Sequence, residues 1–71
     1  MNEIDFLVRP NGTIWLFEPV TERAREYTLT YLDIQDWQWV GPSFTVDHRI
    51  ANDLVIALEE EGWRVTAESS P

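Results

Sequence analysis

The chain has 71 residues, enough for one small domain, and it has no cysteine, which excludes a disulfide framework and a thiolate metal site. Hydrophobic residues make up 44% of it and aromatic residues 13%, so a packed core is expected and a disordered acidic tail is excluded. Thirteen acidic residues stand against five arginines and no lysine, and the net charge of −8 disfavours direct nucleic-acid binding while it suits solubility or a basic partner.

The first predicted feature along the chain is a β-hairpin over residues 4–18. Residues 4–9 alternate with the period of a half-buried strand, and Asn11-Gly12 is typical of a tight hairpin turn because both residues tolerate a positive φ. Residues 13–18 then carry large apolar groups on both sides. This pattern predicts a central strand.

A short helix is expected next. Pro19 ends the second strand, and Thr21 is a suitable N-cap for a helix that begins at Glu22. The threonines that follow are poor helix formers, so the helix is expected to stop near Leu29. Its inner face is expected to carry Ala24, Tyr27 and Tyr31.

Strand structure is predicted on both sides of Gly41-Pro42, over residues 36–40 and 43–47. The proline leaves two alternatives: a bulged edge strand, or a short strand, a turn and a second strand. In a strand, Trp37 and Trp39 would share one face. We expect Trp39 to be largely buried and Trp37 to be an exposed contact residue.

The clearest helix covers residues 48–60, with Asp47 or His48 at its start and Gly62 just past its end. Its predicted inner stripe consists of Ile50, Leu54, Ala57 and Leu58. Residues 63–67 then form a last short strand. The order is strand, strand, helix, strand, helix, strand: a single α+β domain over residues 1–67, with a mostly antiparallel sheet, both helices on one face, and a loose tail at residues 68–71.

No catalytic, cofactor or metal site is predicted. His48 is the one histidine, and five residues separate it from Asp53, so the two side chains point about 140° apart around a helix and do not converge. No cysteine or G-x-S-x-G serine offers a nucleophile, and the three glycines do not form a phosphate loop.

Acidic residues and one tryptophan form the predicted partner-binding site. Three consecutive glutamates end the second helix, where the helix dipole makes acids slightly unfavourable unless a basic partner offsets them. Two aspartates precede an exposed tryptophan, which is a typical anchor residue at protein interfaces. The predicted residues are Asp33, Asp36, Trp37, Glu59, Glu60 and Glu61.

Two stretches, residues 12–27 and 46–65, resemble short acidic proteins of bacterial phages, plasmids and integrated elements. The matching positions are Gly12-Thr13-Ile14, Phe17, Pro19, Thr21, Ala24, Trp39-Val40-Gly41, Val46-Asp47-His48-Arg49-Ile50 and Asp53-Leu54. The chain departs from this pattern with Tyr27 in place of tryptophan and Ile50 in place of tyrosine. The resemblance implies a mobile-element origin, and by context an anti-CRISPR-like role.

The sequence therefore predicts a non-enzymatic, cytoplasmic binding module without a membrane anchor. Its partner would be a basic surface of a host defence or DNA-processing complex, which it inhibits in the manner of an anti-CRISPR protein or a DNA mimic. The alternative is a structural or assembly module that forms a homodimer through residues 37–43, with the acidic charge serving solubility.

Overall fold

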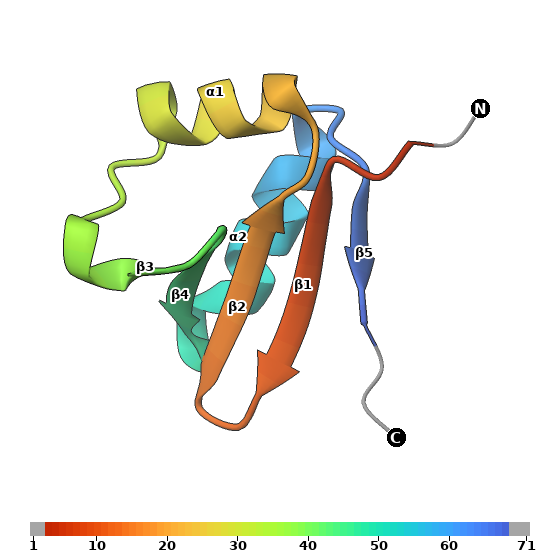
Figure 1. Ribbon diagram of the computed structural model, residues 1–71. Helices are drawn as coiled ribbons and strands as arrows, with labels where there is room; N and C mark the ends of the chain where they lie inside the picture. The colour runs from red at the N-terminus through yellow and green to blue at the C-terminus, as the bar shows by residue number, and fades with distance from the viewer. Residues whose placement is uncertain (1–2, 69–71) are drawn as a thin grey trace.

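The structure is a computed structural model, and it describes residues 3–68 of the chain. It is α+β, as predicted, with one five-stranded sheet and two helices (Figure 1). The strands are β1 (Phe6–Asn11), β2 (Ile14–Pro19), β3 (Trp39–Val40), β4 (Ser43–Asp47) and β5 (Val65–Ala67). The helices are α1 (Glu22–Tyr31) and α2 (His48–Glu60), and a 3-10 turn, η1 (Asp36–Gln38), precedes β3.

The sheet is mixed, with the strand order β3-β4-β2-β1-β5. Three pairings are antiparallel, but β5 runs parallel to β1, because α2 carries the chain from β4 across the sheet before β5 begins. Figure 1 shows α2 behind one face of the sheet and α1 across one end of it. The predicted α+β class is therefore confirmed. The predicted element order is only roughly matched, because η1 and β3 precede β4 and the edge strand β5 is parallel. Both helices were predicted on one face, whereas α1 lies across one end of the sheet.

The predicted hairpin is present as β1 and β2. Asn11 pairs with Ile14, and Gly12 between them has a φ of 63°, a left-handed conformation that favours glycine. The first strand begins at Phe6, two residues later than predicted, and Pro19 is the last residue of the second strand.

Helix α1 begins where predicted and ends two residues later. The Thr21 hydroxyl accepts a hydrogen bond from the Ala24 backbone N–H at 3.1 Å, which is the expected N-cap. The helix continues past Leu29 to Tyr31, whose ring lies 5.2 Å from that of Tyr27. This aromatic pair, four residues apart on one face, favours the last turn against its weak helix propensity.

Helix α2 is capped at both ends as predicted. The Asp47 side chain accepts a hydrogen bond from the Arg49 backbone N–H at 2.8 Å. Gly62, with a φ of 96°, turns the chain, and the Trp63 N–H then donates to the Leu58 carbonyl oxygen at 3.0 Å. That bond spans five residues, as in a Schellman motif.

The predicted inner stripe of α2 is wrong in two of its four members. Ala51 and Leu58 are buried, whereas Ile50 is 59% exposed and Ala57 is also exposed. Neighbouring helix positions differ by 100° around the axis. Because Ile50 and Ala51 are both apolar, the periodicity alone did not decide which of them faces the sheet.

The core lies between α2 and the covered face of the sheet. The rings of Phe17 and Phe44 stack on adjacent strands with centroids 5.5 Å apart, and the edge of Trp63 meets Phe6 at 5.7 Å. The buried apolar residues are Phe6, Val8, Phe17, Ala24, Phe44, Val46, Ala51 and Leu58.

The segment predicted as a strand before Gly41 is mostly a 3-10 turn. Gln35 and Gln38 close η1 through reciprocal bonds between side chain and backbone, and only β3 remains extended. The two tryptophans therefore do not share a strand face. Trp39 is half-buried against Phe44, with ring centroids 5.6 Å apart, and Trp37 is 79% exposed.

The C-terminal residues 69–71 of the predicted tail lie outside the described residues. Glu68 is described, and its backbone N–H donates to the Val8 carbonyl oxygen at 2.7 Å. Its carboxylate meets Arg9 at 3.0 Å. These two contacts continue the edge of the sheet by one residue beyond β5.

Candidate protein-binding surface

The six residues predicted to bind a partner are all exposed, but they do not form one cluster. They lie in two places, in or beside η1 and at the C-terminal end of α2: Asp33, Asp36, Trp37, Glu59, Glu60 and Glu61. Glu60 and Glu61 border a hollow between α2 and the loop after α1. Glu59 instead borders a different hollow, with Ile4 and Trp63.

A hollow of about 610 Å³ lies beside β4, between η1 and α2, and we call it the Trp37 groove. Its apolar lining residues are Ile14, Ile34, Trp37, Val46, Ile50 and Leu54. Its polar lining residues are Gln38, Thr45, Asp47 and Asp53. A mostly apolar wall with a few polar groups is typical of a binding site.

A second hollow of about 340 Å³, the Leu32 hollow, lies further along α2. Leu54 lines both hollows, so they are neighbours along α2, and we call the pair the α2 trough. Ile50, Leu54 and Ala57 follow one another along its helical wall at spacings of four and three residues. The Leu32 hollow is further lined by Tyr27, Leu32, Leu58, Glu60 and Glu61.

Trp37 stands on a turn that is fixed at both ends. The Gln35 backbone N–H donates to Gln38 Oε1 at 3.0 Å, and Gln38 Nε2 donates to the Thr45 carbonyl oxygen at 3.1 Å. Ile34, just before the turn, packs against the core. The backbone that carries the exposed indole is therefore fixed, and this lowers the backbone entropy that binding through Trp37 would cost.

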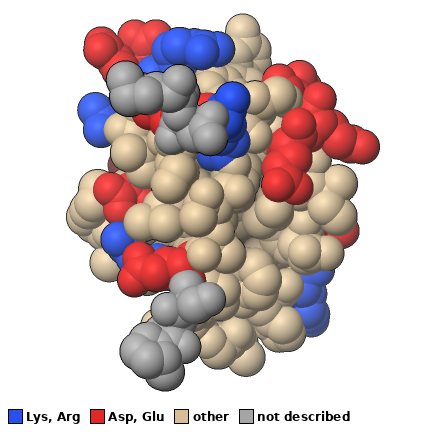
Figure 2. Space-filling view, turned by 90° about the vertical axis from the view of Figure 1, so that its right-hand side faces the viewer, with Lys and Arg blue, Asp and Glu red and all other residues tan. Residues whose placement is uncertain are grey.

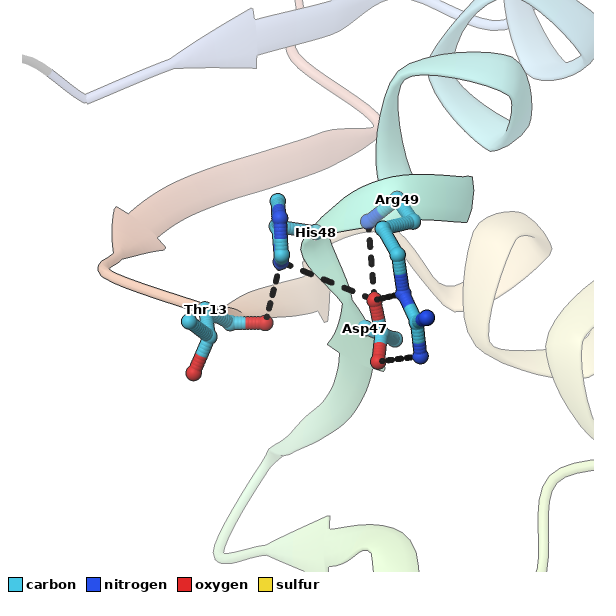
Figure 3. Close-up of polar contacts among 4 residues, drawn as sticks. All are labelled: Thr13, Asp47, His48 and Arg49. Carbon is cyan, nitrogen blue, oxygen red and sulfur yellow. Dashed lines mark hydrogen bonds and ion pairs between the residues drawn. The ribbon is translucent and has the colours of Figure 1, made fainter.

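The Asp47 carboxyl group has a lowered pKa, and its role is structural. Hydrogen bonds from the Arg49 side chain and backbone hold its pKa at about 2. Figure 3 shows the guanidinium beside this carboxylate, with Nε of Arg49 at 3.1 Å from Oδ1. The Nδ1 of His48 lies 3.2 Å from the Thr13 carbonyl oxygen and 3.6 Å from Asp47 Oδ1.

This arrangement at the start of α2 fastens the helix to the β1–β2 hairpin. The His48 backbone N–H also donates to the Thr13 carbonyl oxygen, at 2.8 Å. Asp47 is committed to the helix cap and to Arg49, so it is a poor general acid or base.

Charge is unevenly distributed over the described surface. The charged residues that line the Trp37 groove are Asp47 and Asp53, and no arginine lines either hollow of the trough. Figure 2 shows the β5 side of the molecule, where basic and acidic groups are both present. Arg9 there pairs with Glu68, and the Arg23 guanidinium lies 5.2 Å from the Trp63 ring centroid.

Residues 3–68 contain neither a metal-binding cluster nor a membrane-spanning helix. No group of three or more His, Asp or Glu side chains there is placed to hold a metal ion. Neither helix in this part of the chain is long and apolar enough to cross a membrane.

Comparison with known proteins gives no match: no family model, no curated protein and no solved structure is significantly similar to the chain.

Sequence reasoning missed several residues of the Trp37 groove: Ile14, Ile34, Ile50 and Asp53. Ile50 was predicted to lie on the inner stripe of α2, and Asp53 was considered as a possible partner of His48. Their spacing of three residues places them on one flank of a helix. That spacing was visible in the sequence, but it does not show that this flank faces η1.

Proposed function

We propose that this protein is a non-enzymatic binding module that docks on a basic surface of a partner protein. Trp37 is the central anchor, and Asp53 in the Trp37 groove gives the surface its preference for positive charge, because the other aspartate there, Asp47, is already paired with Arg49. The net charge of −8 adds a long-range attraction that speeds encounter with such a partner.

One observation carries this proposal. A 79% exposed tryptophan stands on a fixed turn beside an apolar groove whose charged lining residues are both aspartates. Tryptophan is strongly enriched among residues that dominate binding energy at interfaces. An indole left in water by a domain of this size is best explained by a partner that covers it.

We further propose that the partner belongs to a host defence or DNA-processing complex, which the protein inhibits. Proteins of this kind have basic channels for nucleic acid, and an acidic module competes for them by charge. The resemblance to mobile-element proteins supports this narrower proposal.

Affinity capture from a bacterial cell lysate tests the proposal. At low salt the immobilised protein is expected to retain a nucleic-acid-handling complex, which high salt releases because screening weakens the attraction between exposed charges. Trp37→Ala should lose the complex, whereas Leu29→Ala, which removes another exposed apolar side chain, should retain it. Equal capture by both variants would contradict the proposal.

The alternative, a homodimer through residues 37–43, has one observation in its favour. Strand β3 is the outermost strand of the sheet, and Val40 in it is 57% exposed. It offers only two residues for pairing, however, and Ser43 in the next strand is buried. Sedimentation analysis at increasing concentration distinguishes a dimer from a monomer.

A further inference from the structure

We propose that the α2 trough binds one short basic amphipathic helix of the partner protein. Its apolar side chains would enter the trough, and lysine or arginine side chains near its two ends would meet the acids at the two ends of the trough. This inference rests on the proposed function and specifies the kind of segment that the module recognises.

The dimensions of the trough fit such a helix. Its helical wall runs from Ile50 to Glu61, a distance of roughly 16 Å at 1.5 Å per residue. This length corresponds to about three turns of a bound helix. The two hollows lie on either side of Leu54, so one segment laid along α2 would contact both.

Large apolar side chains on both walls of the trough are exposed to solvent, as expected for a surface that a partner covers. Trp37 on one wall is 79% exposed and Ile50 on the other is 59% exposed. Their neighbours Ile34 and Leu54 are half-buried and continue the apolar surface between them. A helix with apolar residues at positions i, i+3 or i+4, and i+7 presents the matching ridge.

Acidic groups stand at both ends of this apolar strip, and no basic residue lines it. Asp47 lies at the Trp37 end but is paired with Arg49. Asp53 lies further along the Trp37 groove, beside Leu54, and among residues 3–68 no hydrogen bond or ion pair engages its carboxylate. Glu60 and Glu61 lie at the other end, where the dipole of α2 itself disfavours them. Basic side chains of a bound helix would offset this unfavourable interaction with the dipole. The glutamates at the end of α2 would then serve to attract the partner.

An extended peptide fits less well. It would have to pair with β4 beyond the end of β3, and there the Thr45 carbonyl oxygen already accepts the Gln38 side-chain amide at 3.1 Å. A helix satisfies its own backbone groups and requires no such pairing. Its side chains alone make the contacts that the trough offers.

Selection from displayed peptides tests the proposal with the full chain as the target. One library presents helical peptides with basic residues at both ends and randomised residues on the apolar face. A second library has the same composition with central prolines, which prevent a helix. We expect binders from the first library only. Selection from the proline library alone would overturn the proposal.

Two isoleucines on α2 provide a matched pair of variants. Ile50 lines the trough, and Ile56, which is 47% exposed, does not line either hollow. Ile50→Ala should weaken binding of a selected peptide about tenfold, whereas Ile56→Ala should leave it nearly unchanged. Asp53→Asn should weaken binding of the peptide less than Ile50→Ala does. Its effect should be larger at low salt than at high salt, because salt screens the charge that the substitution removes. Equal effects of both isoleucine substitutions would place the peptide elsewhere.

The outcomes separate this inference from the proposed function. If no helical peptide is selected but capture from lysate still depends on Trp37, the module binds its partner in another way and only the helix proposal fails. If neither peptide binding nor capture of the complex depends on Trp37, both the helix proposal and the proposed function fail. A dimer of the protein that Ile50→Ala dissociates would show that a second copy occupies the trough, and would also overturn the proposal.

Discussion

Gln38 ties the exposed turn of η1 to the sheet through Thr45: its side-chain amide donates to the Thr45 carbonyl oxygen at 3.1 Å. The same side chain accepts from the Gln35 N–H at 3.0 Å, so one residue fixes both the turn and its distance from β4. The position of Trp37, and with it one wall of the Trp37 groove, depends on this residue.

Gln38→Ala is therefore expected to lower both stability and binding. The loss of hydrogen bonds to two backbone groups should reduce the free energy of unfolding by about 1–2 kcal/mol. Partner affinity should fall as well, because Trp37 is no longer held in place. Urea unfolding and titration calorimetry measure the two effects. Asn52→Ala, at an exposed position on α2, serves as the control and should change neither. A Gln38→Ala variant with unchanged affinity would show that the turn needs no anchor.

The pKa of Asp47 predicts a pH dependence of stability. Its folded-state pKa of about 2 lies below the ordinary aspartate value of 3.8, so the unfolded chain binds the proton more readily. The stabilising contribution is complete above a pH of about 4 and is lost as the pH falls through 4 towards 2.

Asp47→Asn isolates this effect, because asparagine is also a good N-cap and keeps the helix start intact. Urea unfolding between neutral pH and about pH 2 is expected to show a shallower loss of stability for the variant than for the unchanged protein. Identical slopes for the two proteins would show that Asp47 titrates normally.

Gly12→Ala should destabilise the hairpin through the backbone alone. A Cβ at this position would meet no atom within 4 Å, so the expected loss of roughly 1–2 kcal/mol comes from the φ of 63° and not from a clash. Gly12→Asn should cost less, since asparagine visits this conformation more readily. Thermal unfolding of the two variants provides the comparison, and an equal loss for both would contradict the backbone explanation.

Local signals in the sequence predicted the fold well where one residue type has one physical role. Gly12 marked the hairpin turn, and Thr21 and Asp47 marked the helix starts, because each residue acts on its own backbone neighbourhood. Gly62 marked the end of α2 for the same reason.

Features that depend on distant residues were not predictable in the same way. The turn at η1 requires Gln38 to reach Thr45, seven residues away on another strand. The exposure of Ile50 depends on which of two adjacent apolar residues the sheet covers. The Trp37 groove depends on both the turn at η1 and the exposure of Ile50. The sequence therefore indicated Trp37 on one wall and missed Ile50 on the other.

The most direct test of the central claim is the affinity of the purified partner for Trp37→Ala, measured by calorimetry beside Leu29→Ala. Removal of a central anchor is expected to cost about 2 kcal/mol or more, a loss of roughly thirtyfold in Kd. Leu29, which is 69% exposed on α1, lines neither hollow of the α2 trough, and its substitution should leave Kd unchanged. If the two variants bind with the same affinity as the unchanged protein, Trp37 is no anchor and the Trp37 groove is not the binding surface.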